Sequence, residues 1–73
     1  MEKDFNKFRF AVFSYDKNDV RDNGVTHHNL SLEQIGKIFA FPEDFINELK
    51  TLPKHKQAYY KDASTEYQVT RKE

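Results

Sequence analysis

The chain contains no cysteine, and this absence excludes several kinds of site. Disulfide bonds, thiolate metal centres and thiol nucleophiles all need cysteine. Glycine is also scarce: Gly24 and Gly36 stand alone, so no glycine-rich loop can cradle a phosphate. The fold therefore has to be held by its apolar core, and the lack of cysteine favours a reducing compartment.

Long apolar runs are missing as well. The first ten residues mix charged side chains with phenylalanines. A secretory signal needs a continuous apolar stretch, and a transmembrane helix needs about 20 apolar residues. We therefore expect a cytoplasmic protein that does not bind a membrane. At 73 residues, the chain is predicted to form a single small domain, residues 1–73.

Neither sign of charge dominates, because 12 basic residues stand against 12 acidic residues. This balance argues against a strongly electrostatic nucleic-acid binder. The charges are unevenly spread along the chain, however. Residues 42–52 hold three acidic residues and one lysine, whereas residues 54–73 hold five basic residues and three acidic ones. The middle of the chain is acidic and its tail is basic.

Aromatic and apolar residues recur in regular patterns. The stretch KFRFAVFSY alternates with the period of a strand and predicts a strand over residues 8–15 with both faces partly covered. The Asn23–Gly24 pair is a strong turn signal. Residues 25–28 are then predicted to form a short returning strand.

Two short amphipathic helices are predicted next. Ser31 and Gln34 have the spacing of a capping box, so the first helix begins after Ser31 and is expected to end near Ala40. Pro42 suits the first turn of a second helix, which Pro53 closes. The predicted buried stripes are Leu32, Ile35, Ile38 and Phe39 in the first helix, and Phe45, Ile46, Leu49 and Leu52 in the second.

After Pro53 the pattern becomes that of a hairpin, with strands at about residues 56–60 and 66–70. Together these elements predict the fold class. It is a small α+β domain with one or two N-terminal strands, a two-helix corner and a C-terminal β-hairpin.

The corner LEQIGKIFAFPEDFINEL resembles the helix-turn-helix pattern. The buried and small positions of that pattern are occupied by Ile35, Gly36, Ala40, Phe41, Ile46 and Leu49. The hairpin that follows then resembles the wing of a winged-helix domain, so the resemblance covers residues 31–71. It implies a transcription regulator that binds nucleic acid.

The second helix lacks the charge of a DNA-reading helix, because its exposed positions are acidic or neutral and would face phosphates. Such a face suits a basic protein surface instead. Seven phenylalanines and four tyrosines are more than a small core holds, so some are expected to be interface anchors. The leading hypothesis is a small non-enzymatic regulator or inhibitor that binds a larger protein partner through Glu43, Asp44, Asn47 and Glu48. Small size and an abundance of Lys, Asn, Phe and Tyr are typical of bacterial phage and mobile-element proteins.

The hairpin supports an alternative hypothesis, nucleic-acid binding. Aromatic rings on a basic β-ribbon can stack on bases. The competing interpretation is that Tyr60, Tyr67 and Val69 cover the helices while the lysines solvate an edge strand. The residues of the alternative site are Lys56, Tyr59, Lys61, Arg71 and Lys72.

No residues have the pattern of a catalytic or metal site. Ser31 is explained as a helix cap, and no serine lies in a nucleophile-elbow context. His27 and His28 are adjacent and point to opposite faces of a strand, so they cannot easily hold one ion. We expect no enzyme activity, no cofactor and no metal. We also expect a monomer, or a homodimer formed through the Phe13 and Tyr15 side of the first strand.

Overall fold

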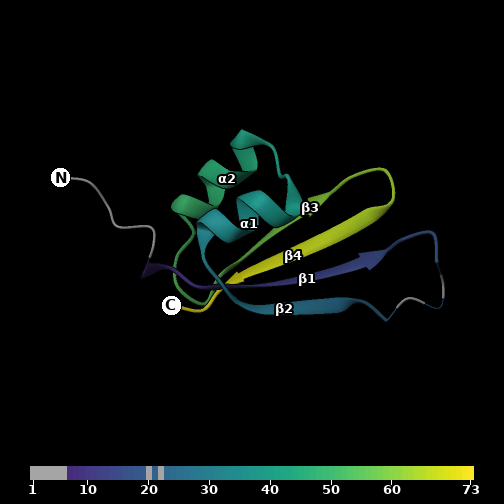
Figure 1. Cartoon of the computed structure of the whole chain (residues 1–73), viewed down its shortest axis with the longest axis horizontal. Coiled ribbons are helices and arrows are strands. Elements are labelled where there is room, and N and C mark those ends of the chain that lie inside the picture. The colour runs from purple at the N-terminus through teal and green to yellow at the C-terminus, as the bar shows by residue number, and fades with distance from the viewer. Residues whose placement is uncertain (1–6, 20, 22) are drawn as a thin grey trace.

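The computed structural model describes residues 7–19, 21 and 23–73. Figure 1 shows two helices lying over one end of a single sheet, with the strand ends extending beyond them. The elements are β1 (Phe10–Asp16), β2 (Val25–Leu30), α1 (Leu32–Phe39), α2 (Glu43–Lys50), β3 (Gln57–Lys61) and β4 (Thr65–Arg71). This order confirms the small α+β domain with N-terminal strands, a two-helix corner and a C-terminal hairpin.

The sheet is antiparallel and has the strand order β2-β1-β4-β3. Its centre is the pairing of β1 with β4, which runs from Phe10 opposite Arg71 to Asp16 opposite Thr65. The first and the last strand of the chain therefore pair in the middle of the sheet. The hairpin β3–β4, which the winged-helix resemblance would make a wing, is half of this sheet.

The two faces of β1 have different surroundings. Phe10 and Val12 point to the helices and are fully buried. Phe13 and Tyr15 point to the opposite face and are half-buried. No helix or strand among the described residues covers that face (Figure 1). The prediction that both faces of this strand are partly covered is confirmed, because on the side away from the helices Ala11 is buried and Phe13 and Tyr15 are half-buried.

Strand β2 carries a bulge near its end. Phe10 pairs with Leu30 but Val12 pairs with His27, so β2 has one residue more than β1 in this interval. Asn29 takes a left-handed conformation there, with a φ of 58°. The extra residue bends the strand end and brings Leu30 into the core while residues 25–29 stay exposed.

Helix α1 begins with the predicted capping box. The Oγ of Ser31 accepts a hydrogen bond from the Gln34 amide at 3.2 Å, and the Gln34 side chain accepts one from the Ser31 amide at 2.8 Å. The helix ends at Ala40, which is left-handed with a φ of 51°. Both helices have eight residues, and no helix in the described part of the chain is long and apolar enough to cross a membrane.

One member of the predicted apolar stripes is misplaced. Leu32 and Ile35 are buried and Phe39 packs against the core, but the Ile38 side chain is 54% exposed. At about 100° per residue, Ile38 lies roughly 90° around the helix from the centre of the other three. The prediction that Ile38 is buried is wrong, because an eight-residue helix presents only a narrow stripe to one sheet.

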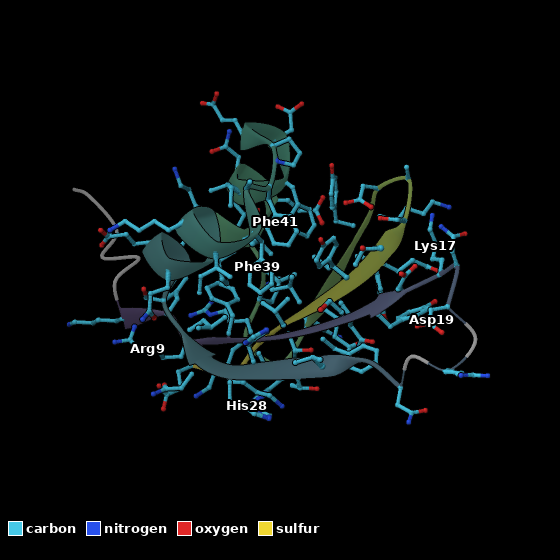
Figure 2. The ribbon with its side chains drawn as sticks, turned by 45° about the vertical axis from the view of Figure 1, so that its right-hand side comes forward. Arg9, Lys17, Asp19, His28, Phe39 and Phe41 are labelled. Carbon is cyan, nitrogen blue, oxygen red and sulfur yellow. The ribbon has the colours of Figure 1, made fainter. Side chains whose placement is uncertain are left out.

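The core between the helices and the sheet is centred on the ring of Phe41. Its centroid lies 4.8 Å from Phe45 of α2, 5.3 Å from Phe39 of α1, 5.4 Å from Tyr60 of β3 and 5.0 Å from Tyr67 of β4. Most of these contacts are edge-to-face, the geometry that the ring quadrupole favours. Figure 2 shows Phe39 and Phe41 between the helices and the sheet. Tyr60 and Tyr67 thus pack beneath the helices, as predicted.

The far ends of the two hairpins are tied together. Lys17 donates from its ammonium to the Asp62 carbonyl and from its amide to the Ser64 carbonyl, both at 2.8 Å. The Asp62 carboxylate accepts hydrogen bonds from the amides of Ser64 and Thr65. These amide bonds are the main cause that lowers the pKa of Asp62. The turn at Asp62 is therefore ordered by its own carboxylate.

The capping box gives the first testable prediction. Ser31→Ala removes the side-chain acceptor for the Gln34 amide and should lower the free energy of unfolding by about 1 kcal/mol. Urea denaturation followed by circular dichroism measures the loss. Ser31→Thr keeps a hydroxyl acceptor and should stay closer to wild type, and equal stability of Ser31→Ala and wild type would contradict the role of the cap.

The ring of Phe41 gives the second prediction. Phe41→Ala should cost about 3–5 kcal/mol, because it leaves a cavity among four rings. A domain of this size has only a few kcal/mol of stability, so we expect loss of the cooperative thermal transition. Phe41→Leu fills most of the space and should retain a transition at lower temperature. A Phe41→Ala variant that melts like wild type would show that the cluster is not central.

Candidate functional site

Helix α2 presents the first candidate surface. Phe45 and Leu49 hold its inner side in the core, where Leu49 is fully buried. The predicted contact residues lie on the outer side, and all four are exposed: Glu43, Asp44, Asn47 and Glu48. We call these four residues the acidic face of α2.

The charges of this face are uncompensated. Glu43, Asp44 and Glu48 form no ion pair with another residue of the described ranges 7–19, 21 and 23–73. Glu43 and Asp44 lie in the first turn, where negative charge interacts favourably with the helix dipole. The helix therefore tolerates these carboxylates without a neutralising partner and displays them to solvent.

The exposed Ile38 of α1 lies in the same layer of helices as the acidic face of α2. Helix α1 packs beside α2, and Ile38 is one of three large hydrophobic residues exposed in the described part of the chain. A solitary exposed isoleucine needs no explanation. It adds an exposed apolar side chain to the helical layer that carries the acidic face.

The five residues of the alternative hairpin site are split by the sheet. Tyr59 and Lys61 alternate with the buried Ala58 and the inward-pointing Tyr60, so they lie on the side away from the helices. Lys72 lines a hollow on that same side. Lys56 is exposed in the loop before β3. The structure therefore places Tyr59, Lys61 and Lys72 on one side of the sheet, with Lys72 several residues along the sheet from the other two.

Arg71 is already engaged on the helix side. Its guanidinium lies 3.6 Å from the ring centroid of Phe8 and donates a hydrogen bond of 2.9 Å to the carbonyl of Leu52. A second hydrogen bond runs from its Nε to the carbonyl of Glu73. Arg71 thus ties β4 to the end of the helical segment. It does not lie with the other candidates, because residue 71 shares the core face with Val69.

The side of the sheet away from the helices is a second candidate surface, which we call the open face. Two hollows of about 440 and 460 Å³ touch this face and are both lined by Phe13 and Gln68, and the first is lined by Tyr60 and Tyr67 of the helix side as well. Tyr59, Lys61 and Lys72 were predicted site residues, whereas Gln57 and Gln68 were not. Alternation along β4 was the available signal, because it places residues 66, 68, 70 and 72 on one face.

One hydrogen bond crosses the open face. The hydroxyl of Tyr15 donates to the Glu66 carboxylate at 2.6 Å. This bond, helped by partial desolvation and the negative charge, raises the pKa of Tyr15 above its ordinary value of 10.0. The pair fixes the orientation of the Tyr15 ring, which lies 6.0 Å from that of Phe13.

The two neighbouring histidines lie on opposite sides of β2. His27 packs its ring 5.5 Å from that of Phe39 on the helix side, whereas His28 lines a hollow on the open face. Figure 2 shows His28 pointing away from the helices. The predicted separation of the pair is confirmed. Within the described residues, no three His, Asp or Glu side chains are placed to share a metal ion.

Comparison with known proteins finds no matching family model, no matching curated protein and no matching solved structure. The resemblance of residues 31–71 to helix-turn-helix and winged-helix domains thus stays a prediction from sequence spacing.

The Tyr15–Glu66 hydrogen bond gives the third prediction. From the ordinary pKa up to the raised value, the folded chain keeps a proton that the unfolded chain loses, so stability falls as the pH rises above 10.0. Phenolate absorbance should show a late titration, above the ordinary pKa of a tyrosine. Glu66→Gln removes the negative charge and should shift this late titration down. The same late titration in Tyr15→Phe would assign it to another residue.

Proposed function

We propose that this chain is a non-enzymatic regulatory protein of the cytoplasm that binds a larger protein partner. It acts as an inhibitor or modulator by covering a surface of that partner. The observation that carries the proposal is the acidic face of α2, whose carboxylates are exposed and unpaired within the described residues.

The partner surface is expected to be basic. The helix holds the backbone of these residues in place, so backbone entropy is not lost when a complementary surface docks, although each side chain still loses rotamer freedom. Opposite charges also accelerate encounter and select the partner. A protein that handles nucleic acid carries such a basic surface, and covering it would block its access to nucleic acid.

The exposed Ile38 supports an interface of ordinary composition. Protein interfaces combine an apolar contact with a polar rim, and charged rims alone contribute little affinity. Ile38 on α1 supplies the apolar contact and the α2 carboxylates supply the rim. The two elements pack against each other, so one partner surface can reach both.

The test is a quantitative pull-down that compares matched variants. Glu43→Lys with Asp44→Lys reverses two charges of the acidic face and should abolish capture of the specific partner. Asp19→Lys with Glu33→Lys makes the same change of charge outside α2 and should capture it like wild type. Circular dichroism of both variants checks that they are folded, because reversing charges in the first turn costs the helix up to about 1 kcal/mol each.

A second variant tests the apolar contact without changing charge. Ile38→Ala should weaken capture several-fold and leave stability nearly unchanged, since the side chain is exposed. The proposal fails if every captured protein binds all four forms equally. It also fails if Lys61→Glu with Lys72→Glu abolishes capture while the reversal at Glu43 and Asp44 does not.

A further inference from the structure

Three strands of the open face form a row of flat side chains. Phe13 of β1 pairs with Gln68 of β4, and Gln68 pairs with Tyr59 of β3. The row therefore places an amide between two aromatic rings, with the strands about 4.8 Å apart. Tyr59 is 67% exposed, and its hydroxyl donates to the Gln57 side chain at 2.8 Å.

The Phe13 ring packs against the backbone at Gly24. A Cβ on Gly24 would lie 2.4 Å from its outermost carbon, so the ring occupies the space that a side chain would need. Gly24 also takes a φ of 83°, which favours glycine. The ring is thus seated against the backbone of the β1–β2 hairpin. Phe13 and Tyr59 are two oriented aromatic platforms on one surface.

The charge of this face is positive although the chain is neutral. The strand register and alternation place Arg9 beside Lys72 on the open face and Lys61 beside Glu66. Among the described residues of β3 and β4 and the residue after β4, Lys61 and Lys72 thus stand on this face against one carboxylate, that of Glu66. The helices have the opposite balance, with four acidic residues (Glu33, Glu43, Asp44 and Glu48) and two basic ones (Lys37 and Lys50).

We propose that the open face binds single-stranded nucleic acid. Bases would stack on Tyr59 and Phe13, where every base has a π-face and sequence preference is weak. Lys61 and Lys72, which lie on opposite sides of the row along the strand direction, would neutralise phosphates of the bound strand. Gln57 and Gln68 offer both donors and acceptors to the edges of the stacked bases.

A single strand fits this surface better than a duplex or a second copy. Bases in a duplex are stacked on one another and cannot lie on a sheet, whereas unpaired bases can. Two open faces packed together would set Lys61 and Lys72 against each other, and like charges facing one another are unfavourable. The positive, aromatic face is complementary to a flexible polyanion.

The experiment is a fluorescence anisotropy titration of a short labelled oligothymidylate with the whole protein at low salt. Tyr59→Ala should weaken binding about 5- to 100-fold, as for the loss of one stacked base. Tyr59→Phe keeps the ring and should bind like wild type. Lys61→Gln with Lys72→Gln should weaken binding and lower the salt slope by about 1.4, at about 0.7 per phosphate contact.

Two control variants test whether the oligothymidylate binds on the open face. Lys37→Gln removes one positive charge on the helix side and should leave the affinity unchanged. Glu66→Gln removes the only carboxylate among the described strand residues of the open face, keeps an acceptor for Tyr15 and should tighten binding. If Glu66→Gln leaves the affinity unchanged, or if Lys37→Gln and Lys61→Gln lower the affinity equally, the attraction is non-specific and the inference is overturned.

The remaining outcomes also decide it. No anisotropy change at low salt, or equal affinity for the matching duplex, overturns the inference. Sedimentation that shows a dimer dissociated by Tyr59→Ala would assign the open face to a second copy instead. Glu43→Lys with Asp44→Lys leaves the open face intact and should bind the oligothymidylate at least as tightly as wild type, so this proposal and the protein-partner proposal can fail separately.

Discussion

The fold depends most on the packing of one ring, that of Phe41, which lies between the two helices and the strands β3 and β4. It contacts Phe39 of α1, Phe45 of α2, Tyr60 of β3 and Tyr67 of β4. Tyr60 of β3 and Tyr67 of β4 point toward the helices, so the residues next to them on each strand point to the opposite face. The buried cluster therefore determines what the open face displays as well as which side of α2 is exposed.

The same constraint separates the charges. Only one sheet and two short helices are available, so each element has one inner side and one outer side. The outer side of the helices collects most of the acidic residues of that layer, and the outer side of the sheet collects Arg9, Lys61 and Lys72. The net charge of the whole chain therefore says little about which partners it binds. Solvent screens distant charges, so a ligand is affected mainly by the charges of the face that it contacts.

The elements were largely predictable because their signals are local. The capping box at Ser31, the effect of Pro42 on the end of the first helix and the alternation of KFRFAVFSY act within a few residues, and the predicted strands and helices agree with those observed within about three residues. The predicted acidic residues of α2 are exposed as expected. Ile38 was misassigned, because spacing alone does not say how wide a stripe a short helix buries.

The pairing of β1 with β4 was not predictable in the same way. No local pattern records which strand lies beside which, and this pairing joins residues about 50 to 60 positions apart in the sequence. One error of interpretation follows from it, because the hairpin was treated as a surface by itself. The grouping of Arg71 with Lys72 has a local cause instead, since adjacent strand residues face opposite sides.

This long-range pairing has a consequence for binding. The open face is a composite of β1 at one end of the chain and β3–β4 at the other, so the isolated hairpin would carry Tyr59 and Lys61 without Phe13 or Arg9. A ligand that spans the row contacts the folded chain and finds no such row in the unfolded one. It therefore stabilises the β1–β4 pairing by mass action. Binding on this face and formation of the sheet are therefore coupled equilibria. Binding on α2, in contrast, requires only that this helix stay packed on the Phe41 cluster.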